Sequence, residues 1–214
     1  MGTLPVEKIS QWKRDGFLSP FPLLDEMELQ ACRQGVERYE AWLGRPINAH
    51  PDMKWRSMPY LLMPWAAKLA RDPRHVAELA RIVKDSVNRA GQVITEPFDD
   101  SRPVPMPLKP GWLSMHHGLC PHRSGPNTSS HRRIGLGLNY IPTHARPSGS
   151  FRHVALLVRG TDRYGHFEPA AWPEEELGQR EVATHERALS LYRDAYLEAE
   201  AKHAKLSERT AAVA

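Results

Sequence analysis

The chain has 214 residues, 41% of them hydrophobic and 25% charged, which is the composition of an ordinary soluble globular protein with one sizeable domain. Its net charge of +4 is mild, and no block of five or more Lys and Arg residues occurs, so nucleic-acid binding is disfavoured. The longest apolar stretch, Tyr60–Ala67, is too short to span a bilayer, and Met1–Lys13 lacks the apolar core of a secretory signal. Cys32 and Cys120 fit neither a zinc spacing nor a disulfide framework, so we expect a cytoplasmic protein with no membrane partner.

The first third of the chain is predicted to be helical. Asp25 is a candidate N-cap with Glu28 three residues later, a capping-box arrangement, and the helix that it opens is expected to end at Gly44. Arg45–Pro59 is predicted to be an irregular loop. Further helices are predicted over Pro5–Asp15, ending at Gly16, over Pro64–Ala70, and over Arg74–Arg89 with Gly91 as the residue after its end. A short extended segment, Phe17–Leu23, is expected after the first helix.

The middle of the chain is predicted to be β, and the tail helical. Strand candidates are Gln92–Glu96, Trp112–His116, Arg133–Tyr140 and Phe151–Val158, the last of which also fits an apolar loop. The prolines of Pro103–Pro110 make that stretch a connection rather than a central strand. A long helix is expected over Glu181–Ser207, with an apolar stripe that fits core packing or, as an alternative, a partner-binding face.

The densest chemistry lies in one run, His122-Arg123-Ser124-Gly125-Pro126-Asn127-Thr128-Ser129, with Arg133 four residues beyond it. Taken alone, His122 is more often a structural histidine than a metal ligand. Asn127 is expected to make an Asx-type hydrogen bond in its turn, and Cys120 to pack in the interior. A turn after His122 would reverse the chain and return Arg133 beside it on a neighbouring strand.

These residues resemble the distal half of the phytanoyl-CoA dioxygenase family, which are non-haem Fe(II)/2-oxoglutarate oxygenases. The resemblance runs over Gly111–Pro142, and the N-terminal part shares Asp15-Gly16-Phe17-Leu18 and Pro64-Trp65 with Leu69 and Arg71-Asp72-Pro73. It implies an α+β fold: a partial double-stranded β-helix (jelly-roll) sheet flanked by N-terminal helices and a long C-terminal helix. Within one domain, 1–214, the parts would be a mainly helical 1–91, jelly-roll strands in 92–160, and a loop with the C-terminal helix in 161–214.

The resemblance also implies roles for three residues. His122 would be the distal imidazole ligand of Fe(II), in a centre that the family completes with a second imidazole and a carboxylate. Arg133 would bind the far carboxylate of 2-oxoglutarate through its planar fork, and Ser124 would add a hydroxyl hydrogen bond to it. The reaction would couple oxidative decarboxylation of 2-oxoglutarate to hydroxylation of a small organic or acyl substrate.

The family's proximal His-x-Asp pair is missing from the interval in which it should lie. Residues 74–111 contain His75, in a stretch with a helical pattern, but no His-x-Asp. The simplest account is an internal deletion near residues 76–82. The chain's one His-x-Asp, His50-Pro51-Asp52, falls in the irregular loop, where Pro51 does not suit an inner strand, so we interpret it as a chance occurrence.

Three hypotheses follow. The first is an oxygenase of this family that is impaired by the lost ligands, with exposed sheet edges that favour self-association. The second is a non-catalytic remnant or binding module. The third is a different metal held by His116, His117 and His122, which is disfavoured because adjacent residues of a strand point to opposite faces. His116 and His117 otherwise fit surface, supporting or substrate-facing positions.

Overall fold

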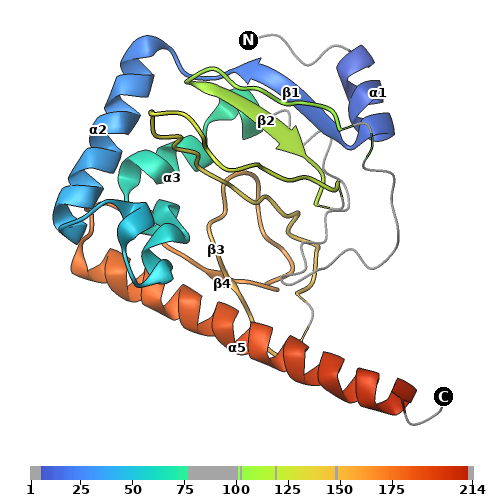
Figure 1. Ribbon diagram of the computed structural model, residues 1–214. Coiled ribbons are helices and arrows are strands. Elements are labelled where there is room, and N and C mark those ends of the chain that lie inside the picture. Colours follow the sequence, from blue (N-terminus) through green and yellow to red (C-terminus); the bar gives the residue numbers. More distant parts are fainter. Residues whose placement is uncertain (1–5, 77–100, 102, 119, 148, 212–214) are drawn as a thin grey trace.

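A computed structural model describes residues 6–76, 101, 103–118, 120–147 and 149–211. Among the described residues, a first helix is followed by a strand, a second helix, a run of short 3₁₀ turns and a third helix, and a long C-terminal helix comes last (Figure 1). The first strand pairs with a strand from the middle of the chain, and a second small sheet forms before the C-terminal helix. This mixture confirms the α+β class. None of the helices in these ranges is long and apolar enough to cross a membrane.

The N-terminal helices begin and end where the local signals predict. Helix α1 (Val6–Asp15) ends before Gly16, whose φ of 73° suits glycine. Helix α2 (Glu26–Leu43) begins with the predicted capping box and ends at Gly44 in the left-handed conformation. Helix α3 spans Pro64–Ala70, as predicted. A further helix begins at Pro73, and its predicted continuation to Arg89, together with Gly91 and the strand Gln92–Glu96, lies outside the described residues.

The loop between α2 and α3 contains three single turns of 3₁₀ helix. They are η1 (Ile47–Ala49), η2 (Met53–Arg56) and η3 (Pro59–Leu61). Tyr39 of α2 donates a hydrogen bond from its hydroxyl to the carbonyl of Trp55 at 2.9 Å, which fastens this loop to the helix. The main core cluster forms here from Tyr39, Leu62, Met63 and Ala66, with Val182 of the C-terminal helix packed against it.

The first sheet joins the chain's beginning to its middle. Strand β1 (Phe17–Pro22) pairs antiparallel with β2 (Trp112–His116), in a register that places Phe17 opposite His116. Trp12 of α1, Leu18 and Met115 form a second apolar cluster beneath this pair. The predicted strand at Trp112–His116 is therefore confirmed, and the proline-rich 103–110 is a connection without strand structure.

The second sheet is minimal. Strand β3 (Val154–Ala155) pairs in parallel with β4 (Glu168–Pro169), and only this part of the predicted 151–158 stretch is extended into a sheet. The prediction of a strand over Arg133–Tyr140 is wrong, because that segment has no strand structure. Side-chain alternation assigns faces, but a strand also needs a neighbour for its backbone N–H and C=O groups. Across the described ranges the two small sheets do not make up the predicted jelly roll.

Helix α5 (Gln179–Ala211) runs along one side of the molecule, and its C-terminal end extends past the other described elements (Figure 1). Of its predicted apolar stripe, Ala188 and Leu191 are buried, whereas Tyr192 and Tyr196 are 42% and 38% exposed. Among the described side chains of the stripe, Ala188 and Leu191 pack against the core, whereas the two tyrosines reach solvent. Backbone contact between Leu177 and Leu62, 2.9 Å from N to O, ties the start of α5 to the main cluster.

Candidate functional site

Strand β2 fixes the position of His116, which lies six residues before His122. Its pairing with β1 continues past Phe17, since the His117 amide donates to the Gly16 carbonyl at 2.7 Å. The neighbouring rings then diverge: the His117 ring meets Trp12 edge-on at 6.4 Å between centroids, and the His116 ring lies beside His122. The expectation that adjacent histidines face opposite ways is confirmed, and it removes the three-histidine site as one cluster.

His122 follows a tight turn after β2. The Cys120 amide donates to the His117 carbonyl at 2.9 Å, and His122 Nδ1 lies 2.9 Å from the Cys120 carbonyl oxygen, to which it donates. The centroids of the His116 and His122 rings are 4.0 Å apart, and both residues are exposed. Although His116 reaches solvent, partial desolvation of its ring, and next the neighbouring His122, lower its pKa below the ordinary value, which favours the neutral form. Cys120 is half-buried rather than packed in the interior.

Asn127 organises the turn that follows. Its Oδ1 accepts hydrogen bonds from the Ser129 amide at 3.2 Å and the Ser129 hydroxyl at 2.8 Å, and its Nδ2 donates to the His131 carbonyl at 2.6 Å. The predicted Asx-type bond is confirmed. The turn is thereby held by its own side chains without a flanking strand.

Arg132 fastens this turn to helix α2. Its guanidinium donates two hydrogen bonds to the carboxylate of Glu40, at 2.9 and 2.6 Å, and Glu40 also accepts from the Ile47 amide at 2.9 Å. Chiefly through the Arg132 hydrogen bond, the pKa of Glu40 is lowered, so the pair is charged at neutral pH. Sequence reasoning missed this pair because 92 positions separate its members.

Arg133 and Ser124 lie exposed in the same segment. Within the described part of the chain, neither side chain forms a hydrogen bond or ion pair, and no such bond joins either of them to His122. The return strand that was expected to bring Arg133 beside His122 does not form. The guanidinium of Arg132 is bonded to Glu40. Of the two adjacent arginines, Arg133 is therefore the one whose guanidinium can bind another carboxylate.

His50 and Asp52 serve the fold of their own loop. The Asp52 amide donates to His50 Nδ1 at 3.1 Å, and the Asp52 carboxylate caps η2 by accepting from the Lys54 amide at 2.9 Å. The Asp52 carboxylate also lies 3.7 Å from the Lys54 ammonium. These contacts agree with the interpretation that His50-Pro51-Asp52 is not a substitute for the missing ligand pair.

The donors present do not fit the three-ligand iron centre of this kind of oxygenase. Across residues 6–76 and the described parts of 101–211, no group of three or more His, Cys, Asp or Glu side chains is arranged to hold a metal ion. The only predicted ligand with a described position is His122. A single imidazole offers too little to hold Fe(II) against solvent.

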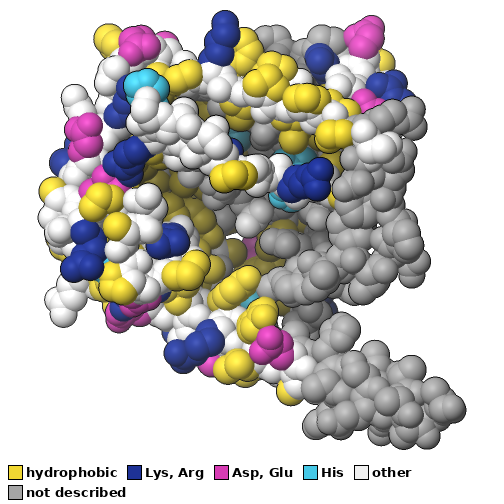
Figure 2. Space-filling model, in the orientation of Figure 1, with side chains coloured by type: hydrophobic (Ala, Val, Ile, Leu, Met, Phe, Trp, Pro, Cys, Tyr) yellow, Lys and Arg dark blue, Asp and Glu magenta, His cyan; other side chains and the backbone are white. Residues whose placement is uncertain are grey.

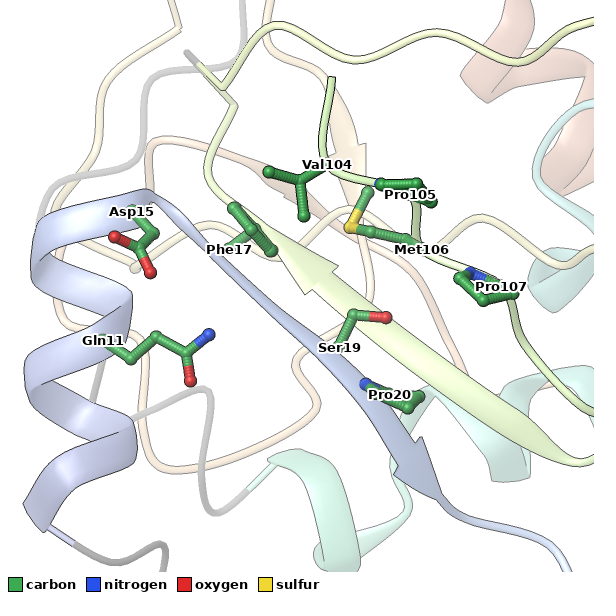
Figure 3. A pocket seen from close by; sticks show the side chains of 9 residues that line it. All are labelled: Gln11, Asp15, Phe17, Ser19, Pro20, Val104, Pro105, Met106 and Pro107. Atoms are coloured by element: carbon green, nitrogen blue, oxygen red, sulfur yellow. The ribbon is translucent and has the colours of Figure 1, made fainter. Parts of the chain in front are cut away.

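Two of the cavities in the described part of the chain lie elsewhere on the molecule. The larger, of about 580 Å³, lies between α1, β1 and the proline-rich connection, with a lining of Gln11, Asp15, Phe17, Ser19, Pro20 and residues 104–107 (Figure 3). The second, of about 370 Å³, has Lys68, Arg71 and Trp172 in its wall, with the Arg71 guanidinium 4.9 Å above the Trp172 ring. Neither is lined by His122, Ser124 or Arg133. On the face drawn in Figure 2, hydrophobic side chains also gather around a central hollow.

Comparison with known proteins identifies the motif-bearing segment. Residues 84–135 match the family model described as phytanoyl-CoA dioxygenase (PhyH), and this range contains His122, Ser124 and Arg133. No curated protein and no solved structure matches the chain. The match covers about a quarter of the sequence and ends where the turn anchored by Arg132 ends. Through this segment the chain is similar to the phytanoyl-CoA dioxygenase family.

Proposed function

We propose that this protein is a phytanoyl-CoA dioxygenase-like Fe(II)/2-oxoglutarate oxygenase that acts on a small organic or acyl substrate, with activity impaired by an incomplete metal site. The observation that carries the proposal is the family match over 84–135, which includes the distal motif. The family relationship supports the reaction class, and the substrate follows only as a class.

The position of the match also supports a lost proximal segment. It begins at residue 84, directly after the interval 76–82 in which the sequence analysis places a deletion. The family's proximal His-x-Asp would lie upstream of the matched segment, and His50-Pro51-Asp52 is engaged in its own loop. The described donors fit no three-ligand iron centre.

What this chain retains is a means of binding the cosubstrate's far carboxylate. Arg133 is exposed, and its permanently charged fork is suited to a bidentate pair with a carboxylate. Ser124, also exposed, would add one hydroxyl donor. His122 would offer the Nε2 lone pair, since its Nδ1 is engaged by the Cys120 carbonyl.

The experiment is an anaerobic mixture of the purified chain with Fe(II) and 2-oxoglutarate, followed by admission of oxygen. An impaired oxygenase gives a weak visible charge-transfer band and slow, substrate-independent formation of succinate, both lost in Arg133→Ala. Absence of the band together with absence of succinate would contradict the proposal and favour a non-catalytic relative.

A further inference from the structure

We propose that His116 and His122 form a two-imidazole site for a borderline divalent transition-metal ion, of the Cu²⁺, Ni²⁺ or Zn²⁺ type. The site shares His122 with the iron centre that the family resemblance implies, but it differs from that centre in using His116 and no carboxylate. Metal binding at this site requires neither 2-oxoglutarate nor oxygen, so its test is independent of the test of the proposed oxygenase function.

The backbone brings the two rings together. His116 ends strand β2 opposite Phe17, and the ladder is extended by the His117 amide bond to Gly16. The turn closed by the Cys120 amide then folds the chain back, so that six residues later the His122 ring lies 4.0 Å from the His116 ring, tilted by 42°. Rotation about the side-chain bonds would let these two tilted imidazoles converge on one ion.

The His122 ring keeps one nitrogen available. His122 donates Nδ1–H to the Cys120 carbonyl, which leaves its Nε2 lone pair for a metal. Metal-binding histidines commonly make such a backbone bond through the other nitrogen, because it fixes the tautomer and orients the ring.

The surroundings suit an ion that accepts few protein ligands. Both residues are exposed, so an ion can reach them and water can complete its coordination. Imidazole suits copper, nickel and zinc, and affinity for divalent ions rises from iron through nickel to copper. Two imidazoles without a carboxylate should therefore bind Cu²⁺ and Ni²⁺ measurably and Fe²⁺ weakly.

Calorimetric titration of chelator-treated protein with Ni²⁺ and with Cu²⁺ tests the site. We expect one equivalent to bind to the wild type, and His116→Asn and His122→Asn each to weaken that binding by about tenfold or more. The matched control is His131→Asn, which alters an exposed histidine of the same segment and should stay within about twofold of the wild type. Unchanged affinity in either pair variant, or an equal loss in the control, would overturn the proposal.

A spectroscopic readout guards against variants that merely misfold. The electron paramagnetic resonance spectrum of one equivalent of Cu²⁺ should show coupling to two nitrogens in the wild type and to one in each single variant. Far-ultraviolet circular dichroism confirms that the variants are folded. A two-nitrogen spectrum that survives in His116→Asn would place the ion elsewhere among the chain's histidines and refute the site.

Discussion

His75 Nε2 lies 2.9 Å from the hydroxyl oxygen of Tyr140, and that hydroxyl donates to the carbonyl of Ala70 at 2.9 Å. The imidazole therefore donates to the hydroxyl, and its buried Nδ1 has no partner. His75 is 6% exposed, and burial lowers its pKa, so the ring is neutral. The bond links the helix that begins at Pro73 to Tyr140, which lies five residues beyond the matched family segment 84–135 and 65 positions from His75.

Tyr140→Phe should destabilise the protein, because it leaves both His75 Nε2–H and the Ala70 carbonyl buried without a partner. We expect a loss of ~1–3 kcal/mol in the free energy of unfolding, measured by urea denaturation. Tyr164→Phe is the control, since Tyr164 is 56% exposed and should change stability little. Equal stability of the Tyr140 variant and the wild type would show that this bond contributes nothing.

Stability should fall in mild acid through His185. This fully buried ring stacks on Trp55 at 5.8 Å and donates Nε2–H to the Ser57 carbonyl at 2.9 Å, leaving Nδ1 without a partner. Burial is the main cause that lowers its pKa from the ordinary 6.5, with nearby Lys54 acting in the same direction.

The sign follows from proton linkage. His185 binds a proton near pH 6.5 in the unfolded chain and only at lower pH in the folded chain. Its contribution to the free energy of unfolding is therefore complete above pH 6.5 and is lost as the pH falls from there toward the folded pKa. The slope for one group is at most ~1.4 kcal/mol per pH unit. His185→Phe, which keeps a ring against Trp55, should flatten the dependence of the urea midpoint on pH between 7.5 and 5.5. Because burial also lowers the pKa of His75, a smaller dependence of stability on pH, of the same sign, should remain in the variant. A pH dependence equal to that of the wild type would exclude His185 as its source.

Arg132→Ala and Arg133→Ala should have opposite effects, although the residues are adjacent. Loss of Arg133 should abolish 2-oxoglutarate binding and leave unfolding unchanged, because this side chain has no partner among the described residues. Loss of Arg132 breaks the pair with Glu40 and should lower stability by less than ~1 kcal/mol while 2-oxoglutarate still binds. Calorimetry with 2-oxoglutarate and urea denaturation check both; an unchanged dissociation constant in Arg133→Ala would refute its assigned role.

Gly35→Ala should destabilise helix α2 despite the better helix propensity of alanine. A Cβ at position 35 would lie 2.6 Å from Cε2 and Nε1 of the Trp65 ring, on helix α3. Overpacking of this kind costs ~1–3 kcal/mol, more than the ~1 kcal/mol that alanine adds to a helix. Thermal denaturation should show a lower midpoint for Gly35→Ala, partly restored when Trp65→Phe is added. A midpoint above that of the wild type would mean that the ring moves aside freely.

Self-association is expected from the unpaired edges of the first sheet. Strands β1 and β2 pair only with each other among the described elements, so each keeps one open edge. Light scattering coupled to size-exclusion chromatography should show an average mass that rises with protein concentration. A monomer mass across the whole range would contradict this expectation.

The sequence by itself determined the features whose causes are local. Asp25 and Glu28 cap α2, Gly44 ends it, and Asn127 bonds to Ser129 two residues on, because each of these involves atoms only a few residues apart. The long C-terminal helix is readable for the same reason, from a pattern repeated over many turns.

Tertiary structure alone decided which groups of the motif meet. Alternation over Arg133–Tyr140 did not yield a strand, since a strand exists only where another segment accepts and donates its hydrogen bonds. Arg132 rather than Arg133 is paired because Glu40, far away in the sequence, reaches it. His116 rather than His117 stands beside His122 because pairing with β1 fixes the face to which each ring points. Such contacts depend on where distant segments are brought in space, which residue spacing within one motif does not encode.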